Sequence, residues 1–365
     1  MVATMRRRKA ITYFILANAF TVGILIHVFW PLICLLFLKG EKDRITLPEL
    51  QIELPPSAIG ANGKPIAQTA AASSPTSPTD APSPPPAPII PKIIHQTWLT
   101  CPVPDLLSGN CTTKPIPEKW VKAQKSVQDF NEEYEYKLWS DKDSREFLEE
   151  RYPWFLPTWD TYQYPVQRAD AIRYFALHHY GGIYIDLDDG CLRRLDPLLA
   201  FPAWVRRTRP TGIGNDVIGA VPGHPFIEKA IKALQSYDMT WPTPYITIMA
   251  STGPLFFSLL WRHYNDQLDR TSEDAEDRRI RLLFWDEYMN TDWSFFIHYK
   301  GRSWHQWDAN AFLFMRHHWI ELTILGFATG FLVIFGLWWL GNFISRKRIF
   351  NRAVYGYMPV KEAEH

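Results

Sequence analysis

The stretch GGIYIDLDDG, residues 181–190, alternates apolar residues and then places three carboxylates within four positions. Alternation with a period of two is typical of a β-strand, and residues two apart share a face, so Asp186 and Asp188 are expected to point the same way. Neighbouring carboxylates repel one another unless a cation, a ligand or water compensates their charge. Two carboxylates on one side of a strand end indicate a hard oxygen site for Mn²⁺ or Mg²⁺. A solvated acidic turn, with Asp189 and Gly190 forming an ordinary bend, fits the same residues.

A helix is expected immediately before this strand. Apolar residues recur at helical spacing between positions 165 and 180, and two glycines then end the run. Asp170, Arg173 and Tyr174 would lie on one face of this helix, which leads into the glycine turn and the carboxylates. A surface ion pair backed by a tyrosine is the alternative interpretation of that face.

Further elements predict an α/β domain around a largely parallel sheet. PKIIHQTW, residues 91–98, is typical of a short buried strand, and YEYKLW, residues 134–139, of a second. Ser140 resembles a helix N-cap, with Asp143 three residues later. Strands that alternate with helices favour a parallel sheet, and ligands bind such sheets beyond the carboxyl ends of the strands. The acidic cluster lies at an end of that kind.

Two long uncharged runs predict two membrane-spanning helices. Residues 11–38 and 322–344 contain no Asp, Glu, Lys or Arg, and each exceeds the roughly 20 helical residues that cross a bilayer core. The first run is far longer than the apolar part of a cleaved signal peptide, about 7–15 residues. The formal net charge of +1 in 365 residues gives no reason to expect a nucleic-acid partner.

The flanking charges predict that the middle of the chain is lumenal. Basic residues precede the first run and follow the second, and such clusters stay in the cytosol: Arg6, Arg7, Arg8 and Lys9, then Arg346, Lys347, Arg348 and Arg352. Asn110-Cys111-Thr112 is an acceptor pattern for N-glycosylation, which takes place in the lumen. Cys101 and Cys111 are near enough in sequence to form a disulfide that would leave Cys191 over, but the sequence does not decide the pairing.

The chain therefore divides into a series of segments with different composition. A Pro-, Ala- and Ser-rich stretch lacks the apolar residues for a core and is expected to form a stem, and the folded domain after it is large enough for one core. The predicted segments are a cytosolic tail 1–10, a transmembrane helix 11–38, a lumenal stem 39–90, a lumenal catalytic domain 91–314, an interfacial segment and second transmembrane helix 315–344, and a cytosolic tail 345–365.

Residues 168–188, RADAIRYFALHHYGGIYIDLD, resemble the signature of the DXD sugar-binding glycosyltransferases, family 32. This group includes fungal Golgi mannosyltransferases and, more distantly, the glucosylating clostridial toxins. R-x-D-x-x-R followed by G-G-x-Y-x-D-x-D is far more specific than D-x-D alone, and PKIIHQTW and HYKGRSW (298–304) fit the same family. With two spans and the SWHQWDA continuation, the nearest resemblance is to the catalytic subunits of fungal inositol phosphorylceramide mannosyltransferases. The resemblance implies a GT-A type nucleotide-sugar-binding fold.

The resemblance also implies roles for single residues. Asp188 would bind the metal directly, and Asp186 would reach the metal's waters or the donor ribose. His298 matches a third metal ligand in related enzymes, although His305 lies one loop away and is an alternative. The residues implied to bind the donor are Asp170 and Arg173 at the sugar hydroxyls, Tyr184 in the nucleotide pocket, Thr97 and Trp98 beside the base, and Trp304 on a loop over the diphosphate.

The implied reaction is metal-dependent, retaining transfer of mannose from GDP-mannose to inositol phosphorylceramide at the Golgi membrane, with a regulatory membrane subunit as partner. Trp304 precedes Leu322, where the second run begins, by 18 residues, so a membrane lipid is the expected acceptor. Asn215 and Asp216 could contact that acceptor, though a turn fits them equally. The alternatives are an α-1,6-mannosyltransferase acting on protein-linked glycans and a non-catalytic lumenal sugar-binding scaffold subunit.

Overall fold

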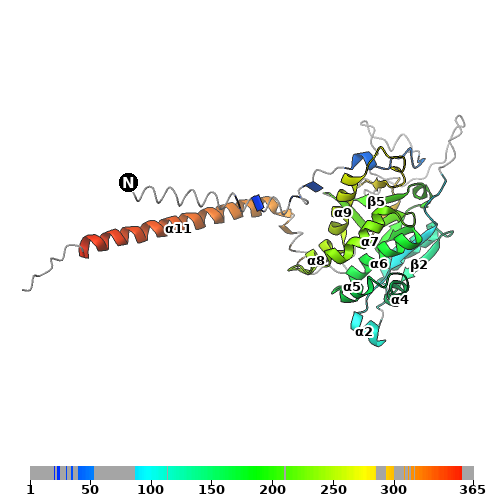
Figure 1. The fold of residues 1–365 in the computed structure, drawn as a ribbon, viewed down its shortest axis with the longest axis horizontal. Coiled ribbons are helices and arrows are strands. Elements are labelled where there is room, and N and C mark those ends of the chain that lie inside the picture. The colour runs from blue at the N-terminus through cyan, green and yellow to red at the C-terminus, as the bar shows by residue number, and fades with distance from the viewer. Residues whose placement is uncertain are drawn as a thin grey trace, which may run out of the picture. The chain divides into compact units, whose positions relative to one another are not determined.

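The computed structural model describes residues 40–52, 87–112, 114–208, 211–284, 293–299 and 317–355, with isolated positions between 20 and 35 and between 308 and 315 (Figure 1). Residues 1–304 and 305–365 form two separate compact units. Most of the predicted first membrane helix, 11–38, lies outside the described residues, as do Trp304 and His305.

The first unit is built on a six-stranded mixed sheet. Among its five pairings, β1 is parallel to β2 and to β3, β5 is parallel to β7, and β6 is antiparallel to both β3 and β5. The predicted α/β class with a mostly parallel sheet is thereby confirmed. In spatial order the strands are β2 (Glu135–Trp139), β1 (Ile93–Thr97), β3 (Gly182–Ile185), β6 (Ile213–Ala220), β5 (Ala203–Arg207) and β7 (Ile280–Leu283).

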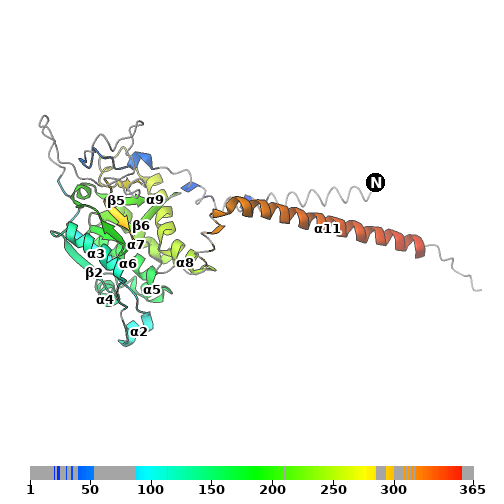
Figure 2. The same cartoon turned by 180° about the vertical axis from the view of Figure 1, so that it is seen from behind.

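Helices cover the sheet, and two buried apolar clusters hold them there. Side chains alternate between the clusters along β3: Tyr184 belongs to the larger one, with residues of α4, α5, α6, α7 and α9, whereas Ile183 and Ile185 belong to the smaller one. Figure 1 shows α6 and α7 over one face, and α3 comes into sight in Figure 2. The helices are α2 (Val103–Ser108), α3 (Glu118–Phe130), α4 (Asp141–Arg151), α5 (Leu156–Thr161), α6 (Pro165–Tyr180), α7 (Pro225–Tyr237), α8 (Pro244–Ser251) and α9 (Pro254–Gln267), with 3₁₀ turns η1 (Glu41–Asp43) and η3 (Asp196–Ala200).

The local predictions around the glycine turn are confirmed. Ser140 and Asp143 form a reciprocal capping box at the start of α4, and α6 ends at Tyr180 with Gly181 as its C-cap. Gly182 has φ 96°, and a Cβ there would lie 2.5 Å from the Ile93 carbonyl oxygen of β1. Only glycine lets the chain enter β3 this close to its neighbour.

The expectation that the strand continues through Asp188 is wrong. β3 ends at Ile185, after which Asp186 donates its backbone N–H to the Asp216 carbonyl at 2.8 Å and the chain turns. The turn occurs because the next residues leave the large sheet: β4 (Asp189–Cys191) pairs antiparallel with β8 (Phe296–His298) in a separate two-stranded sheet. The proposed bend at Asp189 and Gly190 is also wrong, because both residues are buried in β4.

The predicted stem, 39–90, begins with residues that pack on the domain. Ile45 and Leu50 are buried, and Ile45 donates its backbone N–H to the Leu282 carbonyl at the β7 edge, 2.9 Å away. Asp43 lies 2.8 Å from Arg270 and 2.9 Å from Arg279. Residues 40–52 are therefore part of the folded unit, because they supply buried apolar side chains and a buried carboxylate paired with two arginines.

The second unit contains one long helix, α11 (Trp319–Tyr355). Its segment Trp319–Ile344 has 26 residues; the most apolar stretch of 18 residues within it has a mean hydropathy of 2.1, and none of that stretch is buried. Among the described residues this is the one helix long and apolar enough to cross a membrane, and it coincides with the predicted second span.

Candidate active site

A chain of hydroxyl groups leads to the first carboxylate after β3. The Tyr184 hydroxyl donates to the Asp186 carboxylate at 2.6 Å, and the Thr97 hydroxyl lies 2.9 Å from the same tyrosine oxygen. Because the tyrosine proton is used on Asp186, Thr97 donates the second bond. Thr97 and Tyr184 are buried, whereas the Asp186 side chain is 30% exposed. The two hydroxyls thus hold the orientation of a carboxylate that reaches the surface.

A buried arginine links Asp186 to the helix before it. Arg173 of α6 lies 2.7 Å from Asp170 and 3.3 Å from Asp186, and its guanidinium stacks over the Tyr184 ring at 4.5 Å. Asp170 also accepts hydrogen bonds from Asn215 at 3.1 Å and Thr252 at 2.9 Å. Both carboxylate oxygens of Asp170 are therefore bonded inside the protein. The predicted contacts of Asp170 and Arg173 with sugar hydroxyls stay predictions, and what the geometry gives them is a link to Asp186.

Asp188, Asp189 and His298 come together at the small sheet. One ligand atom from each of the three lies within 4.8 Å of those of the other two. Asp189 faces His298 directly in the β4–β8 pairing, and its carboxylate lies 3.4 Å from the histidine Nδ1. Asp188 is partly buried, Asp189 is fully buried and His298 is exposed. Sequence positions more than a hundred residues apart thus meet at the end of β3.

A second buried arginine compensates the inner carboxylates. Arg206 of β5 lies 3.1 Å from Asp189 and 3.3 Å from Asp216 of β6, and its side chain is 1% exposed. Asp216 enters the cluster because β6 runs antiparallel to β3, which brings it beside Asp186. Four carboxylates therefore share one region with two arginines and a histidine, so opposite charges reduce the repulsion between them.

The electrostatic balance differs among the acids. Burial, together with Asp188 and Asp216, raises the pKa of Asp186 to about 8 despite the opposing effect of Arg173. Burial and the neighbouring Asp189 raise the pKa of Asp188 to about 6. Burial acts the same way on Asp189, but there Arg206 and His298 outweigh it and hold the pKa below its ordinary value.

These residues fit a hard divalent cation. Asp186 and Asp188 are partly buried and have raised pKa values, so the region lacks the positive charge that would stabilise both carboxylates in their ionised form. Carboxylate oxygens with one imidazole nitrogen are a ligand set that suits Mn²⁺, and carboxylate oxygens suit Mg²⁺. Asp186 is not one of the three residues that group tightly, since its carboxylate is turned toward Tyr184 and Arg173.

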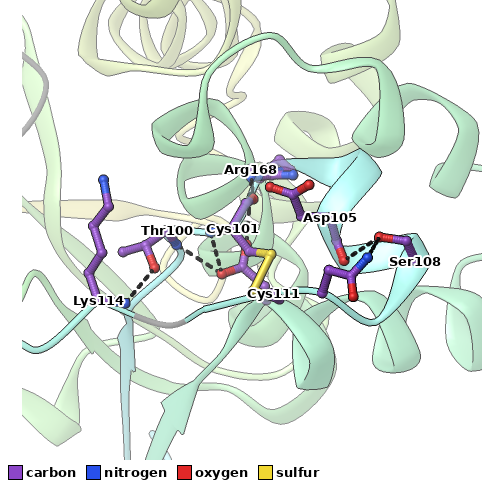
Figure 3. The surroundings of a disulfide bond; sticks show 9 residues. Thr100, Cys101, Asp105, Ser108, Cys111, Lys114 and Arg168 are labelled. Atoms are coloured by element: carbon purple, nitrogen blue, oxygen red, sulfur yellow. Dashed lines mark hydrogen bonds and ion pairs between the residues drawn. A yellow bond between two sulfur atoms is a disulfide. The ribbon is translucent and has the colours of Figure 1, made fainter.

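The disulfide loop anchors the segment after β1, as Figure 3 shows. Cys101 and Cys111 are bonded to each other, which decides the pairing that the sequence left open. Arg168, the first arginine of the R-x-D-x-x-R motif, donates to the Cys101 carbonyl and lies 3.5 Å from Asp141. Asp141 in turn accepts the backbone N–H groups of Thr100 and Cys101 at 2.8 and 3.0 Å. Arg168 thus ties α6 to the loop that follows Thr97 and Trp98.

Trp98 is held at two points. Its indole N–H donates to the Lys114 carbonyl at 2.7 Å, and its ring meets Trp120 of α3 edge-on at 5.6 Å. The structure therefore fixes Trp98 beside the N-terminal part of α3, where its predicted contact with a nucleotide base stays a prediction.

Cys191 is buried in β4, and its sulfur accepts a long hydrogen bond of 3.8 Å from the Asn131 side chain.

Sequence reasoning missed three residues of this region. Asp189 was interpreted as part of a bend, although it stands next to Asp188 in the acidic run. Asp216 was assigned to a turn or an acceptor contact, and Arg206 was not considered. Both enter through the antiparallel pairings of β6 with β3 and β5, and no sequence spacing reports such pairings.

Known proteins are similar to this chain over most of its length. The family "Glycosyltransferase sugar-binding region containing DXD motif" matches residues 117–204. Mannosyl phosphorylinositol ceramide synthase CSH1 of Saccharomyces cerevisiae is 42% identical over 329 residues, which are 90% of this chain and 77% of that one. The chain belongs to this family of ceramide-modifying mannosyltransferases.

Two further relatives are matched over a smaller share of their length. Mannosyl phosphorylinositol ceramide synthase SUR1 of S. cerevisiae is 46% identical over 68% of this chain and 60% of its own. Inositol phosphoceramide mannosyltransferase 3 of Schizosaccharomyces pombe is 47% identical over 67% of this chain and 64% of its own. Among solved structures, the PaToxG glycosyltransferase aligns over 51% of this chain and 73% of its own at 22% identity, with a TM-score of 0.36.

Proposed function

We propose that this protein transfers mannose from GDP-mannose to inositol phosphoceramide, with retention at the sugar carbon and with Mn²⁺ or Mg²⁺ as cofactor. The observation that carries the proposal is the meeting of Asp188 and His298 beside Asp186, in a chain 42% identical to a mannosyl phosphorylinositol ceramide synthase. The GT-A type of the domain is part of the same proposal and is supported by the strand-end position of the acids.

Asp188 and His298 would hold the cation, and Asp186 would complete the site or bind the donor ribose. Bound there, the cation would neutralise negative charge on the departing diphosphate and orient it. The chain's own contribution is to keep these groups fixed before the donor arrives. Tyr184, Thr97 and Arg173 restrict Asp186 in this way, so little reorganisation is needed when charge develops.

The same geometry bears on retention of configuration. Asp186 has one oxygen engaged by Tyr184 at 2.6 Å and by Arg173 at 3.3 Å, and Asp170 is bonded on both oxygens within the protein. Asp170 is therefore not placed as a free nucleophile for a covalent intermediate. This supports attack of the acceptor hydroxyl on the face the diphosphate leaves, with the leaving phosphate oxygen taking the acceptor proton.

The acceptor is proposed to be a lipid in the membrane that α11 spans. Trp319–Ile344 has the length and hydropathy for such a span, and Leu322 lies 18 positions after Trp304, a reach of at most about 65 Å when extended. A chain that ends at Phe314 lacks α11. We expect it to lose transfer to lipid and to keep donor hydrolysis, whereas equal loss of both would count against a membrane-presented acceptor.

The direct test is transfer of radiolabelled mannose by the purified full-length protein in mixed micelles that contain inositol phosphoceramide. The reaction is run with Mn²⁺ or with EDTA, and with GDP-mannose or UDP-glucose as donor. Asp188→Asn should reduce product formation at least about a hundredfold, because an isosteric amide cannot supply the ligand charge. Asp160→Asn, which removes a surface ion pair with Arg145, is the matched control and should retain activity.

Each outcome decides a part of the proposal. Metal-dependent mannosyl lipid that disappears in Asp188→Asn would support donor, acceptor and site together. Hydrolysis of GDP-mannose without lipid product would keep the donor site and point to a protein-linked glycan acceptor or to a missing membrane subunit. Neither hydrolysis nor transfer in the wild-type protein would overturn the enzymatic proposal in favour of a sugar-binding scaffold.

A further inference from the structure

We infer that Asp189 is a positioning residue that holds His298 by one ring nitrogen and directs the other toward the donor site, while Arg206 compensates Asp189 from the interior. The inference rests on the proposed function for the identity of the bound cation. Both Asp189 and Arg206 are buried, and neither is part of the DXD pattern.

Strands β4 and β8 pair so that the two residues face each other. Asp189 of β4 and His298 of β8 are direct partners in the antiparallel ladder, and the Asp189 Oδ1 lies 3.4 Å from the His298 Nδ1. Asp189 is fully buried, whereas the His298 side chain is 45% exposed. One nitrogen of the ring therefore faces an internal carboxylate while the rest of the ring reaches the surface. A histidine that binds a metal commonly gives its other nitrogen to a carboxylate in this way.

On its inner side Asp189 is paired with Arg206. The Arg206 Nη1 lies 3.1 Å from the same Oδ1 oxygen that faces His298, and both side chains are buried, at 1% and 0% exposure. A guanidinium in contact with a carboxylate competes with a cation for that oxygen. Asp188, which is adjacent and partly exposed, has no such arginine among its described ion pairs. Asp188 is thus the better ligand, and Asp189 the better support.

Hydrogen bonds around the small sheet fix the register of β4 against β8 that brings Asp189 and His298 together. The Tyr299 N–H donates to the Asp188 carbonyl at 2.7 Å, so the chain after His298 is tied to the residue before Asp189. On the other side, the Cys191 N–H donates to the Ser126 hydroxyl of α3 at 3.0 Å. A slip of one residue would move His298 to the opposite face, and these bonds oppose such a slip.

The experiment measures Mn²⁺ binding to the full-length protein in detergent by electron paramagnetic resonance, with ¹⁴N modulation of the bound-Mn²⁺ echo as the signature of imidazole ligation. The variants are Asp189→Asn, His298→Gln and the two combined. A positioning role predicts that Asp189→Asn weakens Mn²⁺ affinity about tenfold to a hundredfold and diminishes the ¹⁴N signal. It also predicts that Asp189→Asn has no further effect once His298→Gln is present.

The matched control is Asp43→Asn. Asp43 is also a buried carboxylate paired with arginines, at 2.8 Å from Arg270 and 2.9 Å from Arg279, but it belongs to η1 beside β7. It should lower thermal stability and leave Mn²⁺ affinity and the ¹⁴N signal unchanged. If Asp189→Asn does not fold because the buried Arg206 loses one of its two described carboxylate partners, Asp189→Asn combined with Arg206→Gln removes both buried charges and replaces it in the series.

The inference is overturned if the effects of Asp189→Asn and His298→Gln on Mn²⁺ affinity add, if the ¹⁴N signal survives Asp189→Asn at full strength, or if the wild-type protein binds no Mn²⁺. Failure of the proposed function is a separate result. A protein that shows the coupling of Asp189 and His298 in Mn²⁺ binding but transfers no mannose would keep this inference and reject the proposed reaction.

Discussion

Arg173 lies between two carboxylates in different surroundings. Asp170 is buried and bonded on both oxygens, and Asp186 reaches the surface. A buried charge that loses its partner costs several kcal/mol, whereas a surface pair contributes little. Stability and site geometry therefore depend on the same guanidinium.

Asp170→Asn should lower the free energy of unfolding by about 3 kcal/mol, because it removes a buried partner 2.7 Å from Arg173. Asp129→Asn, which removes an exposed pair with Lys125 at 2.9 Å, should cost less than about 1 kcal/mol. Urea unfolding followed by tryptophan fluorescence measures both. Equal losses in the two variants would show that Arg173 does not depend on Asp170.

Metal binding should strengthen as the pH rises from 6 to 8. The pKa of Asp186 is raised to about 8 by burial and neighbouring acids, and the bond to Asp189 raises the pKa of His298 to about 9. Both groups hold protons at neutral pH in the free protein, and ligands must release protons to bind a metal. The apparent Mn²⁺ affinity should rise about tenfold per pH unit for each proton released. Calorimetric titration at several pH values measures this, and a flat profile would contradict it.

The sequence predicts those residues of the acidic site that belong to a local sequence motif. Asp186, Asp188 and His298 could be named because the motif and the H-x-x-G spacing place them. Asp189 could not be separated from a solvated bend, since its burial depends on the pairing of β4 with β8. Arg206 and Asp216 join through β5 and β6, whose neighbours in the sheet are set by the tertiary fold.

Strand β4 and helix α3 approach each other closely at a glycine. A Cβ on Gly190 would lie 2.6 Å from the Ser126 hydroxyl and 3.3 Å from the Ala123 Cα. This close packing supports the strand that bears Asp189, and glycine is the residue that permits it.

Gly190→Ala should therefore lower the free energy of unfolding by about 1–3 kcal/mol through overpacking and should weaken Mn²⁺ binding, because β4 must shift away from α3. Gly109→Ala is the control: its Cβ meets nothing within 4 Å, although its φ of +73° strains the backbone. That control should lose stability and keep Mn²⁺ affinity. Unchanged Mn²⁺ affinity in Gly190→Ala would show that the position of β4 does not matter to the site.

Element boundaries followed the sequence well wherever a cap or a glycine fixes them. The capping box at Ser140 and the glycine after Tyr180 are local signals, and both helix ends were predicted. The end of β3 was not, because Asp186 leaves the strand to bond the Asp216 backbone and to let β4 join another sheet. The alternation of residues continues in the sequence to Asp188, although the strand pairing of β3 ends at Ile185.

The molecule as a whole combines a disulfide-bonded catalytic unit with an apolar helix. A disulfide at Cys101–Cys111 is typical of an oxidising compartment, in agreement with the predicted lumenal placement of the domain. Asn110 is exposed directly after the C-cap of α2, and its acceptor pattern includes Cys111.

Asn110 should therefore bear an N-linked glycan in the cell. Endoglycosidase treatment should increase the electrophoretic mobility of the wild-type protein and should leave Asn110→Gln unchanged. Thr112→Ala, which keeps the asparagine but removes the acceptor pattern, should behave like Asn110→Gln. An unglycosylated wild-type chain whose Cys101 and Cys111 are alkylated without a reductant would contradict the lumenal placement.

Sugar transfer is proposed to depend on a cation held by Asp188 and His298. The most direct measurement is a crystal structure of the protein with Mn²⁺ and GDP, with an anomalous difference map recorded above the manganese absorption edge. We expect one strong peak about 2–2.4 Å from an Asp188 oxygen and a His298 nitrogen, with Asp189 outside bonding distance. A peak elsewhere, or one at this place that excludes Asp188 or His298, would contradict it.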